Sequence, residues 1–372
     1  MSSQFVSPDV IRANFSSAMS QMYKNEVPLY GELMDLVADV NQKTLDANPA
    51  LRQQLMQTQE LDRLDEERHG AIRLGTAEEL HTIRRLFAVM GMQPVGYYDL
   101  TPAGVPVHST AFRAIHEQSL NISPFRVFTS LLRLELINDA ALQAEARAIL
   151  SQRKIFTDKA LELIELYEKN GGLTESEATQ FIDEVLETFR WHSDATVTTE
   201  QYKNLHDQHR LIADVVAFKG PHINHLTPRT VDIDLIQELM PARGINAKAV
   251  VEGPPPRQCP ILLRQTSFKA LQENVRFIDQ TTEDAMGHHT ARFGEIEQRG
   301  VALTPKGRML YDELLNKTRE TISNVTEKNA DDYRAVLQDN FKEFPDSYQE
   351  LHDQELAYFY YQPTDNGLQN AG

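Results

Sequence analysis

ERHGAIRLGTAEEL, at residues 67–80, is the stretch where the helical pattern of the preceding residues ends and a mixed pattern begins. Its first part is a short mixed run of the kind that forms a strand. Thr76, followed three residues later by Glu79, forms a capping-box pattern, which predicts a helix over residues 77–90 that ends at a glycine. PVGYYDL, at residues 94–100, is rich in residues that favour extended structure. The sequence therefore predicts a strand, a helix and a second strand in succession.

The same kinds of signal extend in both directions from this stretch. Upstream, apolar residues recur at helical spacing, and downstream FRVFTSLLRLELI, at residues 125–137, is apolar enough for a strand buried on both faces. We expect a helical layer over 1–66, the first half of a β core over 67–138, a helical insertion over 139–212, the second half of the core over 213–305, and a C-terminal helical region over 306–372.

The second half of the core is expected to repeat the order of the first. Extended character returns at residues 214–233, a helix is expected over 234–240, and HHTARFGEIEQRG, at residues 288–300, is expected to be a last strand. Each half has a histidine-bearing strand, a turn with threonine, an apolar helix with a methionine near its end, a glycine and further strands. Because the identity between the halves is negligible, this order is a hint of duplication.

Composition limits the classes of function. Of 372 residues, 41% are hydrophobic and 24% are charged, so most of the chain should fold. The 37 Lys and Arg against 54 Asp and Glu give a net charge of −17, which repels phosphate backbones and anionic lipid headgroups. We therefore expect neither a nucleic-acid partner nor a membrane partner.

Cysteine content and the lack of a targeting signal indicate a compartment. The single cysteine, Cys259, excludes an internal disulfide framework and any multi-cysteine metal site. No stretch is apolar for long enough to cross a bilayer, and the first residues lack a signal-peptide pattern. A reducing cytoplasm is the expected location. The sequence has no Walker loop, Rossmann glycine fingerprint or nucleophile elbow, which removes the usual support for nucleotide-binding enzymes and serine hydrolases.

Four polar clusters lie on or beside the expected strands. They are His69 with Arg73, His222 with His225, Glu295 with Glu297 just after His288 and His289, and Arg264 within PILLRQTS. Side chains alternate along an extended chain, so His69 and Arg73 share one face of their strand at a separation of roughly 13 Å. Glu295 and Glu297 share a face for the same reason.

Two histidines and a carboxylate from three strands form a ligand set that suits Fe(II), because positions stay open for a chelating substrate and dioxygen. Ligands scattered so widely along a chain are a weak motif, however. From the residues alone a structural interpretation is favoured. In that interpretation His69 caps a turn, His225 forms hydrogen bonds in a core, and the Glu–Arg pairs are solvated salt bridges.

Seven blocks of sequence resemble one known family. They are QMYKNEVPLYGELMDLVADVN, ERHGAIRLGTAEEL, GVPVHSTAFR, PFRVFTSLLRLELI, FKGPHINHLTPRTVDID, PILLRQTSFKAL and RFGEIEQRGVALTPKGR. They closely resemble the 2-oxoadipate dioxygenase/decarboxylase family, also called 2-hydroxyglutarate synthases, which is similar to a distant branch of the vicinal oxygen chelate superfamily. The resemblance implies an α+β fold with a vicinal oxygen chelate-like mixed β-sheet core, built from a duplicated βαβββ unit, with large helical elaborations and a metal site in the β core.

The resemblance also implies a cofactor and a set of site residues. The implied Fe(II) ligands are His69 of RHGAIR, His225 of HINH and Glu295 of FGEIEQR, with Glu297 as the second choice for the carboxylate. Arg73 matches the family arginine that pairs with the distal carboxylate of the substrate, and we expect it to bind substrate and to be needed for catalysis. Arg264 is a further candidate for binding the substrate.

The implied reaction converts 2-oxoadipate and O2 to 2-hydroxyglutarate and CO2, in lysine catabolism. Longer family members continue past LAYFYYQPT with a segment that helps to close the substrate pocket, so we expect either an incomplete pocket here or one that another segment or partner completes. Two alternatives stay open. One is a redox-neutral metalloenzyme on the same scaffold, such as a glyoxalase-like lyase or isomerase with Zn, Ni or Mn. The other is a dicarboxylate-binding protein that does not turn over.

Overall fold

The computed structural model describes residues 5–66, 68–137, 139–280, 287–290 and 292–360. The chain forms two compact units, each assembled from three stretches of sequence. The first unit contains Met1–Gly31, Glu66–Thr227 and Ala270–Gly294, and the second contains Glu32–Asp65, Pro228–Lys269 and Glu295–Gly372. The five segments expected from the sequence follow the order of helices and strands but do not coincide with these units. Residues 361–372, which include the end of the LAYFYYQPT stretch, lie outside the described residues.

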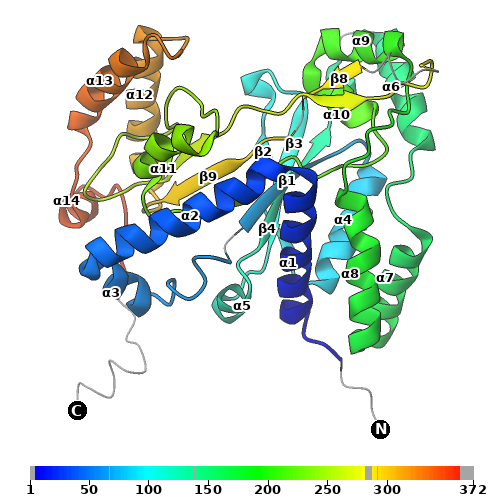
Figure 1. Cartoon of the computed structure of the whole chain (residues 1–372), viewed down its shortest axis with the longest axis horizontal. Coiled ribbons are helices and arrows are strands. Elements are labelled where there is room, and N and C mark those ends of the chain that lie inside the picture. Colours follow the sequence, from blue (N-terminus) through cyan, green and yellow to red (C-terminus); the bar gives the residue numbers. More distant parts are fainter. Residues whose placement is uncertain (1–4, 67, 138, 281–286, 291, 361–372) are drawn as a thin grey trace. The chain divides into compact units, whose positions relative to one another are not determined.

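Helices form one layer of the first unit. They are α1 (Pro8–Glu26), α4 (Ala77–Val89), α5 (Glu117–Ile122), α6 (Ala140–Gln152), α7 (Asp158–Asn170), α8 (Glu175–Phe189), α9 (Thr199–Gln208) and α10 (Arg210–Val216). Helix α1 packs along α8, and α8 packs along α7 (Figure 1). The Phe15 ring contacts both Phe125 and Phe189, with centroids 5.8 and 5.5 Å away. Helices α6 to α10 lie in the stretch where the sequence predicts a helical insertion, but extended structure does not begin at residue 214, because α10 continues to Val216 as a buried helix.

A five-stranded sheet forms the other layer of the first unit. Its strands are β1 (Arg68–Leu74), β2 (Gln93–Asp99), β3 (Val107–Arg113), β4 (Arg126–Leu132) and β5 (Leu226–Pro228), in the order β2-β3-β4-β1-β5. Strand β1 is parallel to β4, whereas the β2–β3 and β3–β4 pairs are antiparallel. The predicted strand, helix and strand are therefore confirmed. Thr76 caps α4, but the Glu79 carboxylate accepts from Gly75 N and pairs with Arg153 instead of closing a capping box.

The second unit has its own small sheet and helices. They are α3 (Pro49–Gln57), α11 (Ile233–Leu239), β6 (Leu263–Ser267), β9 (Glu295–Arg299), α12 (Pro305–Thr321), α13 (Ala330–Asn340), α14 (Tyr348–Asp353) and most of α2 (Pro28–Ala47). Helix α12 packs against α13 (Figure 1), where the Tyr311 and Phe341 rings meet with centroids 5.7 Å apart. The expected C-terminal helical region is thus present as far as it is described.

The two halves of the β core share one topology. In the first half, the order β1, α4, β2, β3, β4 is a βαβββ unit. In the second, Arg229 forms a parallel bridge to Glu297 on β9, β9 is antiparallel to β6, and Glu252 forms an antiparallel bridge to Gln265 on β6. These relations repeat those of β1, β4, β3 and β2. The expected duplication is confirmed, and the expected α+β fold class with it.

The expected last strand over residues 288–300 is wrong. His288 and His289 end β8 (Gly287–His289), which pairs with β7 (Glu273–Val275) in the first unit. Glu295 begins β9, which pairs with β6 in a different sheet. The chain between them leaves the strand, since Phe293 N donates to Asn224 O. The β7–β8 pair therefore lies in an insertion between the last two strands of the second repeat.

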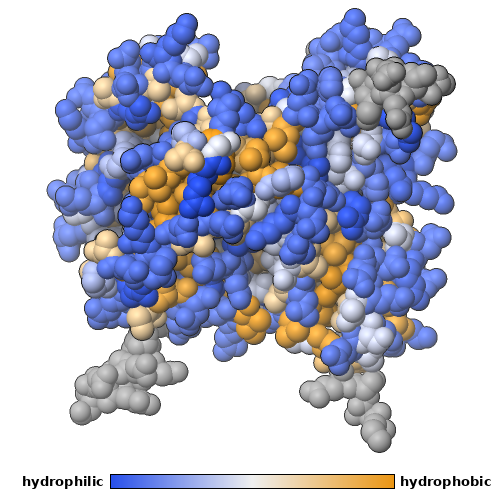
Figure 2. Space-filling model, in the orientation of Figure 1, coloured by the Kyte–Doolittle hydropathy of each residue, from blue (hydrophilic) through white to orange (hydrophobic). Residues whose placement is uncertain are grey.

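The described part of the chain contains no helix that is long and apolar enough to cross a membrane. Most of the surface visible in Figure 2 is hydrophilic, as the high charge content leads us to expect.

Candidate metal centre

Strand β1 presents His69 and Arg73 on one face. Burial alternates along the strand, so that Ile72 is buried and His69, Ala71 and Arg73 are half-buried. The shared face predicted for His69 and Arg73 is therefore confirmed. An arginine on the same face lies beyond the histidine without crowding it.

The HINH segment runs directly beside β1. Asn224 N donates to Ala71 O at 3.0 Å, just before β5 joins the sheet. A Cβ atom at Gly70 would lie 2.4 Å from Ile223 Cδ1 and 3.3 Å from His225 O, so any other residue would require the Ile223 side chain to shift. The result is that the imidazoles of His69 and His225 meet edge to face, with ring centroids 5.7 Å apart and planes at 89°.

Tyr23 of α1 joins the HINH segment to the chain that leads into β9. Its hydroxyl lies 2.9 Å from Asn224 O and 2.9 Å from Phe293 O. The Phe293 ring contacts His225, with centroids 4.8 Å apart. Burial raises the pKa of Tyr23 well above its usual value, so the phenol stays protonated and donates to these carbonyl oxygens. Tyr23 thus fixes the backbone on both sides of the candidate site.

Glu295 follows Phe293 by two residues, a span of at most about 7 Å along the chain. One ligand atom from each of His69, His225 and Glu295 lies within 4.8 Å of the others. The Glu295 carboxylate also accepts from Gln265 Nε2 at 3.2 Å. Within the described residues, these three side chains form the group able to hold a metal ion.

The donor set identifies the kind of metal that fits. Two imidazole nitrogens and one carboxylate oxygen suit a divalent transition metal with positions open for substrate, as in non-haem Fe(II) sites. Catalytic zinc sites use the same donors. Ca²⁺ and Mg²⁺ prefer oxygen ligands, so two imidazoles argue against them. The structure therefore supports a transition-metal centre, in agreement with the expected His–His–Glu set.

The second choice for the carboxylate has another partner. Glu297 is fully buried, and its Oε1 accepts from Arg299 Nε at 2.7 Å. Its backbone oxygen accepts from Thr230 N at 2.8 Å. A carboxylate oxygen held by an arginine is a poorer metal ligand. Glu295, and not Glu297, belongs to the group whose ligand atoms lie within 4.8 Å of one another.

Arg73 and Arg264 lie in different environments. Arg73 Nη1 donates to Asp214 Oδ2 at 2.5 Å, and the side chain keeps 27% exposure on the His69 face of β1. Arg264 donates to both carboxylate oxygens of Asp234, at 2.5 and 2.8 Å. Because Gln265 is paired with Glu297, the preceding Arg264 points to the other face of β6. These contacts give no support to Arg264 as a substrate ligand, which stays a prediction.

Comparison with known proteins identifies the family of this chain. A family model described as 2-oxoadipate dioxygenase/decarboxylase matches residues 15–371. The chain belongs to this family. A 2-oxoadipate dioxygenase/decarboxylase of Pseudomonas putida is 67% identical over 365 residues, which are 98% of this chain and 78% of the relative. A relative of the same name in Escherichia coli is 58% identical over 362 residues, which are 97% of this chain and 79% of the relative.

Solved structures extend the comparison to the fold. Hydroxyglutarate synthase from Pseudomonas putida, in complex with 2-oxoadipate, superposes with a TM-score of 0.93 at 66% identity, covering 98% of this chain and 81% of the other. A putative glyoxalase superfamily protein from Ralstonia eutropha gives a TM-score of 0.52 at 18% identity, over 72% of this chain and 83% of the other. The second likeness concerns the fold alone. Family and fold class both agree with the expectations drawn from the sequence.

Tyr23→Phe is expected to weaken the centre without touching a ligand. The variant removes one hydroxyl, which leaves the Phe293 carbonyl without this donor and Asn224 O with Phe293 N alone, and should cost about 1–3 kcal/mol of unfolding free energy. Loss of such an orienting contact should also lower metal affinity by about 10-fold or more. Denaturant unfolding and metal titration measure the two effects. Tyr311→Phe, at a buried tyrosine of the second unit, should leave metal affinity unchanged, and equal affinities in both variants would contradict the role of Tyr23.

Proposed function

We propose that this chain is an Fe(II)-dependent dioxygenase that decarboxylates 2-oxoadipate and forms 2-hydroxyglutarate. One O2 enters and one CO2 leaves for each substrate molecule, so the reaction needs no further oxidant or reductant. The observation that carries the proposal is the His69, His225 and Glu295 group on a β1 face that also presents Arg73. Family membership supports the choice of substrate and product.

His69, His225 and Glu295 would hold Fe(II) through one atom each. Bound there, Fe(II) would supply a centre where a 2-oxo acid chelates through its carboxylate and keto oxygens while O2 is reduced beside it. With three ligands from the chain, such a centre would keep coordination positions for substrate and O2. The imidazoles add no negative charge, which keeps the site favourable for a dianionic substrate despite the acidic protein.

Arg73 would bind the far carboxylate of the substrate. Its guanidinium presents several N–H donors in a rigid fork that matches a carboxylate. Because Arg73 lies on the same strand face as His69, roughly 13 Å further along the backbone, the distance between the two would select the length of the diacid. Arg73 would thus bind and orient substrate without taking part in oxygen chemistry.

The proposal extends to the cellular setting. The single thiol, Cys259, is buried, and burial raises its pKa to about 11, so it has little thiolate character. A chain with one inert thiol suits a reducing cytoplasm. Lysine catabolism is the setting that the family resemblance implies for 2-oxoadipate.

A redox-neutral metalloenzyme is the second candidate, because catalytic zinc uses the same donors and the fold resembles a glyoxalase superfamily protein. Metal-free protein reconstituted separately with Fe(II), Zn(II) and Mn(II) distinguishes the two in an oxygen electrode. The proposal expects O2 uptake with Fe(II) and 2-oxoadipate alone, one CO2 per O2, with no 2-oxoglutarate, NADPH or flavin. Turnover with Zn(II) and no O2 uptake would favour the redox-neutral enzyme. Binding without any turnover would favour a dicarboxylate-binding protein.

A further inference from the structure

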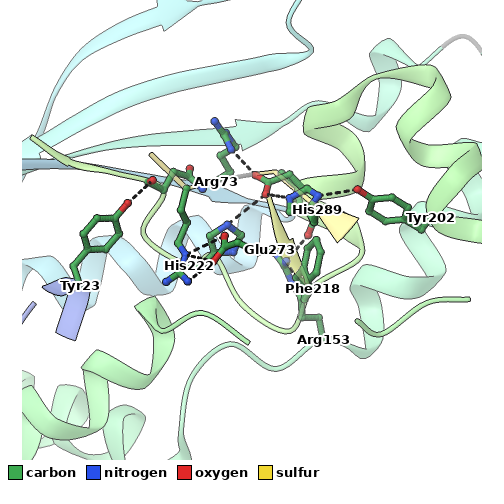
Figure 3. A network of polar contacts seen from close by, with 12 residues as sticks. Tyr23, Arg73, Arg153, Tyr202, Phe218, His222, Glu273 and His289 are labelled. Carbon is green, nitrogen blue, oxygen red and sulfur yellow. Dashed lines mark hydrogen bonds and ion pairs between the residues drawn. The ribbon is translucent and has the colours of Figure 1, made fainter. Parts of the chain in front are cut away.

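Arg73 rests on a buried carboxylate that no sequence motif singled out. Asp214, near the end of α10, is 5% exposed and accepts from Arg73 Nη1 through Oδ2. Its other oxygen, Oδ1, accepts from His289 Nε2 at 2.9 Å and lies 3.4 Å from His222 Nε2. Figure 3 shows Arg73, His222 and His289 converging on this point. Both oxygens of the carboxylate are therefore engaged, one of them by the arginine.

His289 is held in turn by Tyr202 of α9. The Tyr202 hydroxyl lies 2.8 Å from His289 Nδ1, the contact seen at the right of Figure 3. Burial and the nearby Asp214 raise the pKa of Tyr202 to about 12, so the phenol keeps its proton. The ionised Asp214 carboxylate can only accept, so His289 Nε2 donates to it. Tyr202 and Asp214 therefore hold the His289 ring at both of its nitrogens.

Aromatic side chains enclose this network. The Trp191 ring stacks on His289, with centroids 6.0 Å apart and planes at 6°. It meets the His222 ring edge to face, with centroids 4.6 Å apart. The Phe218 ring also packs on His289, with centroids 4.6 Å apart. Burial alone would raise the pKa of Asp214, but Arg73 and the histidines hold it well below its usual value, so the carboxylate stays ionised. Because the packed rings hold the histidines that contact Asp214, the carboxylate binds the Arg73 guanidinium in one orientation.

The consequence concerns the orientation of Arg73. A long side chain with 27% exposure on an open face would otherwise sample several rotamers, at a cost in entropy on ordering. The contact with Asp214 uses one N–H of the guanidinium and leaves the other donors for a ligand. Fixing the fork before the substrate arrives removes that ordering cost from binding.

We propose that Asp214, supported by His289 and Tyr202, is a positioning residue that orients Arg73 toward the distal carboxylate and thereby sets the preference for dicarboxylic 2-oxo acids. This inference rests on the proposed function and deepens it, because it assigns the specificity of the same site. Asp214 acts only through Arg73, since its own oxygens are occupied by Arg73 and the histidines.

Asp214→Asn tests the proposal with two substrates, 2-oxoadipate and 2-oxohexanoate, which has the same carbon chain without the distal carboxylate. We expect kcat/KM for 2-oxoadipate to fall by about 10-fold or more, chiefly through KM, and kcat/KM for 2-oxohexanoate to stay within about twofold. Tyr202→Phe should lower the ratio of kcat/KM for 2-oxoadipate to kcat/KM for 2-oxohexanoate as well, by a smaller factor. In an Arg73→Ala background, Asp214→Asn should cost little further, because the arginine that it positions is gone. An equal loss for both substrates, or a full additional loss in that background, would overturn the proposal.

Controls separate positioning from simple stabilisation. Asp9→Asn also removes a carboxylate from a buried arginine of the first unit, at Arg12, and should leave the substrate ratio unchanged. If Asp214→Asn does not fold, Tyr202→Phe tests the positioning role instead, because it keeps the Arg73–Asp214 contact. An unchanged ratio of the two kcat/KM values in Tyr202→Phe would then overturn the proposal. Calorimetric binding of the two acids to the Fe(II) protein separates the two levels of inference. A wild-type protein that prefers the diacid but consumes no O2 contradicts the proposed reaction alone, whereas an unaltered preference in Asp214→Asn contradicts the positioning role alone.

Discussion

His225→Ala is expected to abolish stoichiometric iron binding while leaving the far-ultraviolet circular dichroism nearly unchanged. The imidazole contributes one of three ligand atoms grouped within 4.8 Å, and His225 is only half-buried. Loss of an orienting partner of a ligand costs about 10–100-fold in metal affinity, so loss of the ligand itself should cost more. Elemental analysis after reconstitution measures the bound iron. Full iron occupancy in His225→Ala would refute the assignment of the centre.

The paired glutamates of β9 provide the internal control. Glu295→Ala should lose iron as His225→Ala does. Glu297→Ala should keep iron but lose stability, because it leaves Arg299 without the carboxylate that it contacts. The opposite pattern, with iron lost in Glu297→Ala and retained in Glu295→Ala, would exchange the two roles.

Arg73→Ala is expected to lower the affinity for 2-oxoadipate by more than about tenfold while iron stays bound. The variant removes hydrogen bonds to a charged group, each worth about 1.5–3 kcal/mol. It also leaves Asp214 buried without its cation, so some loss of unfolding free energy is expected alongside. Steady-state kinetics on folded, iron-loaded protein measures the effect.

Two further variants test whether the substrate carboxylate is bound by Arg73 or by Arg264. Arg73→Lys keeps the charge but not the planar fork, and should recover only part of the affinity. Arg264→Ala should leave the kinetics nearly unchanged, because Arg264 is engaged by Asp234 on the other face of β6. Unchanged kinetics in Arg73→Ala together with a loss in Arg264→Ala would transfer the substrate carboxylate to Arg264.

The first repeat could be predicted from local sequence. A strand, a capped helix and a second strand follow from short-range patterns, and the alternation along a strand places His69 and Arg73 on one face. Strand β3 was not predicted, because polar residues such as Ser109 and Thr110 weaken its apolar pattern. Ser109 is nonetheless buried, where its hydroxyl bonds to that of Ser130 on the neighbouring strand.

The residues that hold the ligands and Arg73 in place could not be predicted from local sequence. Tyr23 lies on a helix about two hundred residues away from Asn224, and Asp214 belongs to a buried helix that was expected to be extended. Tyr23 lies in one of the blocks that resemble the family, and Asp214 lies in none, but no pattern assigns a role to either, because their roles depend on packing between distant stretches. The sequence places His289 on the strand of Glu295, whereas in the structure it ends β8 and contacts Asp214. The family resemblance predicts the metal ligands, whereas the residues that support the site can be identified only from the structure.

Turnover under labelled dioxygen shows where both atoms of O2 enter the product. Oxygen chemistry at the His69, His225 and Glu295 centre is expected to decarboxylate 2-oxoadipate and to hydroxylate the same molecule. Mass spectrometry of the product should therefore find 2-hydroxyglutarate with one labelled atom in the new hydroxyl and one in the carboxylate formed at the former keto carbon, at one CO2 per O2. Glutarate as the product, or 2-hydroxyglutarate with an unlabelled hydroxyl, would contradict the account.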